Sequence, residues 1–387
     1  MNTARTVLAQ LLAIVPFAHF EHLVDNYQAN RWTRGFTAWS HLICMVYAQL
    51  TRREGLRDLV DCLNSQGPKL YHVGLRQRVS RSTLADANER RSAELFEALG
   101  KHLIAMALAQ YQDEDIGLGL KEPLYAMDST TVDLCLKLFP WADFRSTKAG
   151  IKAHTAIDLR GAIPVMLSIT TAKVSDVFML DSLRLPAGSI VVLDRGYVDF
   201  ARLQRLVQRE CSFVVRAKAN LSFRCIQAHP GDAKAGVWSD QTIALAGQQA
   251  SKDYPGALRR VRFYDASTCL ELVFLSNRLD LPPLTIAAIY KQRWQIELFF
   301  KWLKQNLCIQ HFFGNSFNAV KSQIWIAVCA YLLALIAHRP FRDQLSLRNF
   351  LHLLEVNMFE KITLAQMVAN SIRSQEPDPS PLQSELF

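Results

Sequence analysis

The sequence predicts an α/β protein in which helices cover a mixed β-sheet, with an all-helical segment in front and a β-rich insertion within. Residues 1 to about 115 have helical patterning and no alternating strand character. From Pro123 the period changes, and three strands, a helix, a strand, a helix and a strand follow. Between Lys218 and about Pro283, glycines and prolines punctuate short strands. This order of elements is typical of a mixed sheet with an insertion.

Each element is expected from its local pattern. A turn at residues 158–161 joins the second and third strands, and residues 290–307 form a helix after the insertion. A buried helix at 318–337 and a polar helical pair to about 373 precede a mobile tail. The expected strands are 123–132, 151–158, 162–170, 189–193, 212–217, 237–246, 258–264 and 268–276, and the other helices are 174–185 and 197–209. The expected domains are 1–115, 120–217, 218–285, 286–340 and 341–387.

Composition indicates a basic globular protein. The chain has 387 residues, of which 50% are hydrophobic, a formal net charge of +9 and a pI near 9.2. An excess of basic residues favours polyanionic partners through phosphate neutralisation. None of the eight cysteines forms a Cys-x-x-Cys pair or a zinc-like cluster, so they are expected to be buried thiols in a reducing compartment. The N-terminus lacks a signal-peptide cleavage pattern and the longest apolar run, 324–337, is short of a membrane span, so a cytoplasmic protein is expected.

Two basic clusters lie in the helical N-terminal part. The first is an aromatic and basic group made of Tyr27, Arg31, Trp32, Arg34, Phe36 and Trp39. In the second, residues 69–91, six cations stand against two acids, and a turn feeds a helix that Ser82 or Thr83 would cap. This pattern is compatible with a helix-turn-helix reader of DNA, with Arg76, Arg78 and Arg81 as candidate contacts. A solvated helix face with a normal cap is the open alternative.

If the segment 290–304 forms a helix, several of its polar and charged residues lie on one edge and its apolar residues on another. Tyr290, Arg293, Glu297 and Lys304 fall on one edge, and the apolar residues fall on another. A carboxylate among cations suits acid-dependent chemistry on a phosphate backbone. The alternative is an ordinary amphipathic helix with an Arg–Glu pair at i,i+4.

Two further acids end buried strands, Asp128 and Asp194. Ligands collect at the strand ends of α/β sheets. Three carboxylates that converge there, Asp128, Asp194 and Glu297, repel one another unless divalent cations neutralise them. Oxygen ligands without His or Cys favour Mg²⁺ or Mn²⁺. Two such ions about 4 Å apart can promote in-line displacement at a phosphodiester.

Three blocks carry a resemblance to a known family. They are Asp128-Ser129-Thr130, Asp194-Arg195-Gly196-Tyr197 and the Tyr-x2-Arg-x3-Glu-x6-Lys pattern of Tyr290, Arg293, Glu297 and Lys304. The chain resembles the DDE transposases, in particular the bacterial insertion-sequence family with the Tyr-Arg-Glu-Lys (YREK) signature, the IS-four type. The resemblance spans about 120 to 340, and the N-terminal part looks like the leader domain of some members.

The resemblance implies a ribonuclease-H-like catalytic domain with the β-rich insertion before the Glu-bearing helix. It implies that Asp128, Asp194 and Glu297 hold two Mg²⁺ or Mn²⁺ ions, and that Tyr290, Arg293 and Lys304 contact DNA near the cleaved phosphate. A homodimer would nick the terminal inverted repeats and join the 3′-hydroxyls to target DNA, in the bacterial cytoplasm at the nucleoid.

Other assignments are less direct. Some relatives cut through a hairpin with a flipped base, and Trp238 in the insertion is the candidate stacker, whereas Trp294 and Trp302 are expected to pack. Arg195 and Lys148 are candidate DNA contacts, with a solvated role as the alternative. His154 is expected to be a satisfied strand histidine, and the rival acids Asp133, Asp143 and Asp176 to face solvent or cap a helix.

Two other functions stay open at this point. One is a catalytically silent DNA-binding regulator with the same fold, and the other is a nuclease that cuts but never joins. The intact acids disfavour the regulator, and the Tyr-Arg-Glu-Lys row disfavours the simple nuclease.

Overall fold

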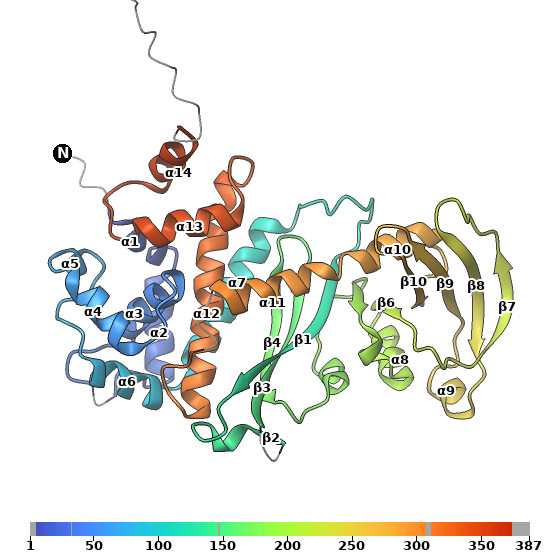
Figure 1. Ribbon diagram of the computed structural model, residues 1–387, viewed down its shortest axis with the longest axis horizontal. Helices are drawn as coiled ribbons and strands as arrows, with labels where there is room; N and C mark the ends of the chain where they lie inside the picture. The colour runs from blue at the N-terminus through green and yellow to red at the C-terminus, as the bar shows by residue number, and fades with distance from the viewer. Residues whose placement is uncertain (1–4, 32, 146–147, 307–310, 374–387) are drawn as a thin grey trace, which may run out of the picture. The chain divides into compact units, whose positions relative to one another are not determined.

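The computed structural model describes residues 5–31, 33–145, 148–306 and 311–373 (Figure 1). The chain forms two compact units. One consists of Met1–Gln110 with Gln305–Phe387, and the other of Tyr111–Lys304. The tail that was expected to be mobile lies outside the described residues.

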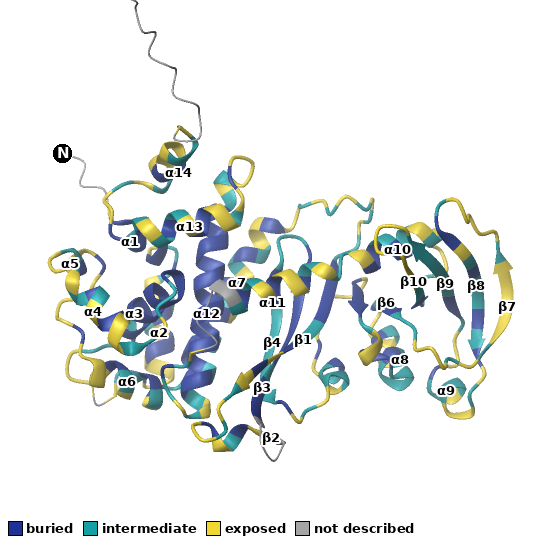
Figure 2. Ribbon diagram, viewed as in Figure 1, coloured by how far each residue is buried: buried dark blue, intermediate teal, exposed yellow. Residues whose placement is uncertain are grey.

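The first unit is helical in the part that the structure describes. Its central element is α12 (Phe317–His338), which is buried along most of its length (Figure 2) and packs on α1, α3, α6 and α13. The other helices are α1 (Val7–Leu12), α2 (Phe17–Asn26), α3 (Ala38–Leu50), α4 (Leu56–Ser65), α5 (Lys69–His72), α6 (Arg81–Arg90), α7 (Ala93–Tyr111), α13 (Leu347–Asn357) and α14 (Leu364–Arg373). Among the described residues, one segment, Phe317–Phe341, is long and apolar enough to cross a membrane, and 94% of its apolar window is buried inside the protein. Such burial is typical of a core helix.

Two contacts fix α12 against the N-terminal helices. Gly100 of α7 lets the helices approach closely, because a Cβ there would lie 2.7 Å from Cε3 of Trp325. At the start of α12, the Asn318 side chain donates to the carbonyl oxygens of Glu89 and Arg91 and accepts from the backbone N–H of Ala93. Asn318 therefore satisfies backbone groups at the junction of α6 and α7 that the helices themselves leave unpaired.

The second unit contains one mixed sheet. In Figure 1, β1 (Leu124–Leu134), β3 (Lys148–Asp158) and β4 (Ile163–Thr171) lie side by side, and they pair antiparallel. On the other side of β1 come β5 (Ile190–Leu193) and β6 (Ser212–Arg216), both parallel to β1. The order across this part is therefore β4-β3-β1-β5-β6. A short β2 (Asp143–Arg145) adds to β3.

The insertion continues the same sheet. Its strand β10 (Leu270–Ser276) pairs antiparallel with β6, and β9 (Leu258–Asp265), β8 (Val237–Leu245) and β7 (Phe223–His229) follow in that order. A short helix, α9 (Gln248–Asp253), lies between β8 and β9. Three of these four strands were predicted, whereas β7 was not. β7 is an edge strand with mostly exposed side chains, so it lacks the apolar pattern of a buried strand.

Four local expectations need correction. The helix predicted at 290–307 is two helices, α10 (Pro283–Lys291) and α11 (Trp294–Asn306). The segment 174–185 contains a 3₁₀ helix, η2 (Asp176–Asp181), and residues 197–209 divide into η3 (Arg195–Tyr197) and α8 (Phe200–Gln208). The N-cap of α6 is Ser80, whose hydroxyl accepts from the N–H of Thr83.

The cysteines also differ in part from expectation. All seven that the structure describes are free thiols. Cys44, Cys211 and Cys329 are buried as expected, whereas Cys135, Cys225 and Cys269 are exposed.

We expect Gly100→Leu to lower the stability of the helical unit by about 1–3 kcal/mol, because the new side chain must displace the Trp325 ring. Leucine has high helix propensity, so the loss would come from packing. Thermal unfolding followed by circular dichroism measures the effect. Ala105→Leu, on an exposed position of the same helix, is the matched control. Equal melting temperatures for the two variants would contradict the close approach of α7 and α12.

Candidate active site

Two acids lie where the pairing of β1 with β5 ends. Met127 of β1 is in register with Leu193 of the parallel strand β5, and Asp128 and Asp194 are the next residue of each. Because neighbouring strands are about 4.8 Å apart, the two carboxylates leave the sheet at one place. The N–H of Ser129 donates to Oδ1 of Asp128 at 2.8 Å. Asp128 was expected to end its strand, but β1 continues to Leu134 along β3, so Asp128 lies within β1. The two acids still lie side by side, because the pairing of β1 with β5 ends at Met127 and Leu193.

The junction of α10 and α11 places Tyr290 and Arg293 beside the two aspartates. After Lys291 the chain makes a tight turn in which the N–H of Arg293 donates to the carbonyl oxygen of Tyr290. The buried Tyr290 ring packs 4.7 Å from the Phe274 ring of β10, and its hydroxyl donates to Oδ1 of Asp194 at 3.2 Å. The turn therefore aims Tyr290 at one aspartate and Arg293 at the other.

Arg293 joins two of the three acids. Its Nη1 donates to Oδ2 of Asp128 at 3.0 Å, and its Nη2 donates to Oε1 of Glu297. The Arg293 side chain is only 18% exposed, whereas that of Glu297 is 56% exposed. Nε of Arg293 is buried and has no hydrogen-bond partner among the described residues. We call this arrangement of Arg293, Asp128 and Glu297 the arginine clasp.

The electrostatics show that the three acids influence one another. Burial raises the pKa of Asp128, and the charges of Asp194 and Glu297 raise it further, while the Ser129 N–H and Arg293 oppose the shift. The buried Tyr197 phenol has a raised pKa, first because of burial and then because of Asp128 and two other acids. Burial and the two neighbouring carboxylates therefore disfavour the charged form of Asp128.

The carboxylates of Asp128, Asp194 and Glu297 are suitable ligands for a hard divalent cation, although Arg293 contacts two of them. In the part of the chain that the structure describes, no three Asp, Glu, His or Cys side chains are arranged to hold a metal ion as they stand. The guanidinium of Arg293 contacts Asp128 and Glu297 where an ion would need their oxygens. Carboxylate oxygens alone are the ligands that Mg²⁺ and Mn²⁺ prefer. Release of Arg293 would leave three such groups.

A polar network around Asp176 holds the side chain of Ser129, the residue after Asp128. Asp176 accepts from the Ser129 hydroxyl at 2.7 Å and from Lys152 at 3.1 Å, and Nδ1 of His154 lies 3.4 Å from the same oxygen. Burial alone would raise the pKa of Asp176, but its interactions with these three partners hold it well below its usual range. His154 is fully buried, and its Nε2 is 2.9 Å from the Thr170 hydroxyl. Its Nδ1 makes no hydrogen bond among the described residues, so the expectation of a satisfied strand histidine holds for one ring nitrogen only.

Asp176 was expected to face solvent or cap a helix, and this expectation is wrong. Ser129 and His154 are directly opposed in the β1–β3 register, and Lys152 is two residues before His154 on the same side of β3. The period of two in Lys152-Ala153-His154 was the available signal. Asp133 is exposed, and Asp143 pairs with Lys173 at 2.7 Å, so these two rival acids lie on the surface.

The other candidates in this unit are spread out. Trp238 on β8 is 45% exposed, stacks on Tyr264 with 5.0 Å between ring centroids, and lies under the Arg262 guanidinium. Arg195 is exposed, and Lys304 lies two helical turns beyond Glu297, about 10 Å along α11. Trp294 was expected to pack but is 51% exposed. The side chain of Lys148 lies outside the described residues.

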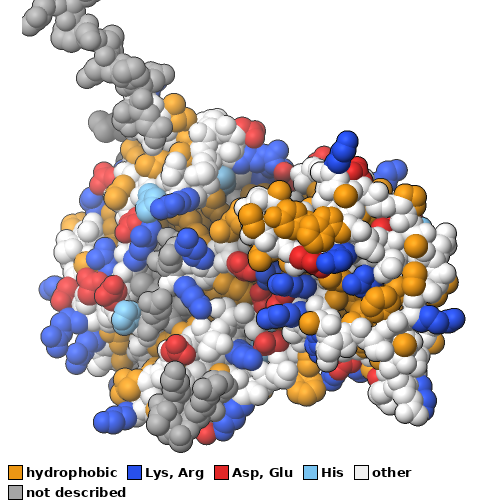
Figure 3. Space-filling view, turned by 45° about the vertical axis from the view of Figure 1, so that its right-hand side comes forward, with side chains coloured by type: hydrophobic (Ala, Val, Ile, Leu, Met, Phe, Trp, Pro, Cys, Tyr) orange, Lys and Arg blue, Asp and Glu red, His pale blue; other side chains and the backbone are white. Residues whose placement is uncertain are grey.

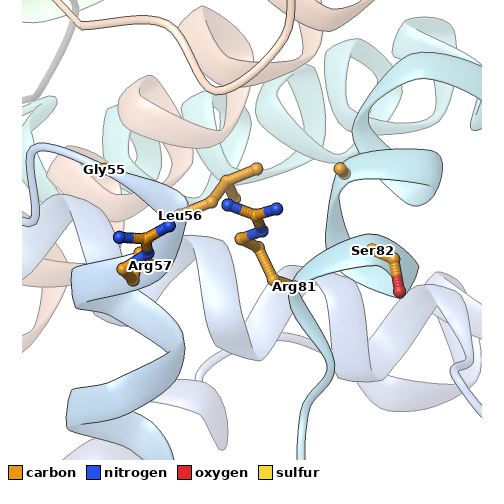
Figure 4. A pocket seen from close by; sticks show the side chains of 6 residues that line it. Gly55, Leu56, Arg57, Arg81 and Ser82 are labelled. Atoms are coloured by element: carbon orange, nitrogen blue, oxygen red, sulfur yellow. The ribbon is translucent and has the colours of Figure 1, made fainter.

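The N-terminal candidates divide between two hollows of the helical unit. Arg76 and Arg78 line a large cleft, whereas Arg81 lines a smaller one beside Arg57 (Figure 4). The single-turn helix α5 and an eight-residue connection precede α6, so the region lacks the short turn between two helices that a helix-turn-helix requires. Basic side chains are interspersed with acidic ones on the face shown in Figure 3.

Known proteins resemble this chain over much of its length. The family model described as "Transposase DDE domain" matches residues 119–333, more than half of the chain, and a "Domain of unknown function (DUF4372)" matches residues 3–76. A protein of Sinorhizobium fredii named as a transposase is 34% identical over 290 residues, 73% of this chain and 78% of its own. A protein of Geobacillus stearothermophilus named as a transposase for insertion sequence element IS5377 is 30% identical over 60% of this chain and 62% of its own.

A solved structure of the piggyBac transposase synaptic complex with hairpin DNA aligns with 99% of this chain and 88% of its own. Its sequence identity is 12% and its TM-score is 0.46, a level of likeness that carries no argument.

A mixed α/β unit with acids gathered at one sheet edge and a family match over most of that unit define a nucleic-acid recombination enzyme of the transposase class. The chain belongs to the DDE transposase family. Membership of this family implies dependence on a divalent metal in general.

We expect Asp176→Asn to destabilise the protein by about 1–3 kcal/mol at neutral pH, because Lys152 and Ser129 lose a charged acceptor. The folded-state pKa of Asp176 lies below its ordinary value of 3.8, so its charge stabilises the fold above about pH 3.8, and this contribution is lost as the pH falls towards the folded-state pKa. The gap in melting temperature between wild type and variant should therefore shrink below pH 4. Asp133→Asn is the exposed control. A gap that stays constant with pH would argue against the network.

Proposed function

We propose that this protein is a DNA transposase that binds the terminal inverted repeats of an insertion sequence, cleaves at its ends and joins the freed 3′-hydroxyls to target DNA. The single observation that supports this most is the convergence of Asp128, Asp194 and Glu297 with Tyr290 and Arg293 at one sheet edge. The family match and the basic net charge of +9 support DNA as the substrate. The reaction would take place in the cytoplasm, at the bacterial nucleoid.

The strand order supports a ribonuclease-H-like assignment for the catalytic core. β3 and β4 run antiparallel on one side of β1, and β5 and β6 run parallel on the other. Asp128 lies within the first strand of that five-stranded core, Asp194 follows the fourth, and the third acid comes from a helix after the insertion. This arrangement, together with the spacing of the Tyr-Arg-Glu-Lys residues, supports membership of the IS-four type.

In this proposal Asp128, Asp194 and Glu297 hold two Mg²⁺ or Mn²⁺ ions. When bound, the ions would supply charge stabilisation for an in-line displacement at phosphorus. The protein would position the carboxylates for the ions. The β1–β5 register fixes the two aspartates, and Tyr290 orients Asp194. The hydrogen bond of the Ser129 hydroxyl to Asp176 fixes Ser129, whose N–H donates to Asp128.

The basic residues would bind the DNA backbone. Arg293 would exchange its carboxylate partners for a phosphate, because guanidinium groups bind both in the same bidentate way. Lys304 would extend the contact along α11, and Arg195 would add a contact from η3. Trp238, already stacked on Tyr264, would stack a flipped base if the ends pass through a hairpin. Two copies would assemble on the paired ends.

We expect Glu297→Gln to reduce metal-dependent nicking of end-containing duplex DNA by roughly a thousandfold, since one anionic ligand contributes several kcal/mol to charge stabilisation. Products are mapped on a denaturing gel after incubation with Mg²⁺. DNA binding in EDTA and the melting temperature should stay near wild type, and Asp133→Asn should cleave normally. A wild-type protein that binds the ends but never nicks them with Mg²⁺ or Mn²⁺ would instead be a catalytically silent regulator.

We expect Arg293→Gln to bind Mn²⁺ at least about tenfold more tightly in the absence of DNA, because two carboxylates lose a charged competitor. The same variant should bind end DNA more weakly. Isothermal titration with Mn²⁺ measures the first effect, with Arg195→Gln as a control for removal of one positive charge. Weaker Mn²⁺ binding in Arg293→Gln would contradict the clasp.

A further inference from the structure

A second candidate site lies wholly within the helical unit. A cleft of about 1290 Å³ is lined by residues 27–31 and 33–37 between α2 and α3, by residues 74–80 and by one side of α6. We call it the arginine cleft, because its lining includes the arginines Arg31, Arg34, Arg76, Arg78, Arg90 and Arg91. The residues that line it overlap the region matched by the domain of unknown function.

The arginines that line the cleft outnumber its acidic residues. Among the described residues that line it, only Glu21 and Asp86 are acidic, and Asp86 lies 3.8 Å from Arg90. Arg34, Arg76 and Arg78 are exposed, and no carboxylate in residues 5–31, 33–145, 148–306 or 311–373 lies within ion-pair distance of them. Three cations that face a concave surface without counter-ions suit a ligand with several negative charges.

One wall of the cleft is held in place by buried hydrogen bonds. The Arg91 guanidinium is 6% exposed and donates to the carbonyl oxygens of Ala29 and Phe36. Oδ1 of Asn30 accepts from the N–H of Ala38 at 2.7 Å. These bonds fix the backbone at residues 29–30 and 36–38 on this wall of the cleft, and a fixed wall favours a preformed site.

Aromatic rings accompany the arginines. Phe17 and Tyr27 are 55% and 39% exposed, and Phe17 lies edge-on to Trp39 with 5.3 Å between ring centroids. All three rings line the cleft. A basic groove with exposed aromatic rings is the arrangement that binds single-stranded nucleic acid, with phosphates on the cations and bases on the rings.

The geometry favours an unpaired strand over a duplex. A duplex hides the faces of its bases, so it cannot use the rings. The side of α6 that carries Ser82, Thr83 and Asp86 lines the cleft, whereas a recognition helix must project into a major groove. The volume exceeds the 300–1,000 Å³ that is usual for small-molecule sites, so the ligand is extended.

We propose that the arginine cleft binds an unpaired segment of DNA, with its phosphates on Arg34, Arg76 and Arg78 and its bases on Tyr27 and Phe17. The inference rests on the proposed function, since that function makes DNA the substrate. It gives the N-terminal region a role distinct from reading duplex sequence.

The test is fluorescence anisotropy of the full-length protein in EDTA, with a labelled oligothymidylate of about 15 nucleotides and the matching duplex as probes. Tyr27→Ala should weaken binding of the single strand about tenfold, and Tyr27→Phe should restore it, because the ring face is retained. Arg34→Gln with Arg78→Gln should lower the slope of log K against log salt by about 0.7 for each phosphate that is no longer neutralised. Arg348→Gln, an exposed arginine outside the cleft, should bind as wild type does.

Unchanged single-strand binding in the Tyr27 and arginine variants would overturn the inference, and so would an equal loss of affinity for single strand and duplex. A separate end-nicking assay with Mg²⁺ tests the proposed function. Wild type that nicks ends while the cleft variants bind oligothymidylate normally would defeat only this inference. Wild type that never nicks would defeat the proposed function instead.

Discussion

The proposed active site depends on one guanidinium, that of Arg293, between two carboxylates. Asp128 is mostly buried, and the charges of Asp194 and Glu297 raise its pKa. Like charges that lie close together destabilise a fold unless a cation balances them. Arg293 supplies that cation from within the chain. Since the same side chain is the proposed phosphate ligand, arrival of DNA and admission of metal would be linked. A protein without its substrate would then carry little free metal affinity, which would limit stray cleavage.

The insertion also contributes to the site. Phe274 of β10 supports the Tyr290 ring, and Tyr290 orients Asp194, so a chain of three side chains runs from the inserted strands to the acid. The sequence pattern presented the insertion as a module between two catalytic segments. The pairing of β10 with β6 makes it instead a continuation of the sheet. The proposed base-stacking residue Trp238 on β8 thereby belongs to the same hydrogen-bonded sheet as Asp128.

The meeting of the two aspartates could be predicted because each follows an apolar run, and the two runs pair in parallel up to Met127 and Leu193. The position of Asp128 inside β1, which continues to Leu134, could not, since residues 128–134 pair only with β3 and lack a continuous apolar pattern. The break between α10 and α11 could not, since Gln292 and Arg293 are ordinary helix formers and no Gly or Pro marks it. Contacts of Tyr290 with Asp194 and of Arg293 with Asp128 override that local preference. The role of Asp176 depends on strand register between β1 and β3, which spacing along the chain does not reveal.

The antiparallel β6–β10 ladder has a consequence for how such enzymes can change in length. Removing the whole inserted segment would strip β6 of its hydrogen-bonding neighbour and present an unpaired, largely apolar edge to other molecules. Trimming from the far side, where β7 already has a polar and solvated border, leaves that ladder intact. Related proteins with a shorter or longer insertion should therefore differ at the outer pair of strands, β7 and β8, while β9 and β10 next to β6 are retained.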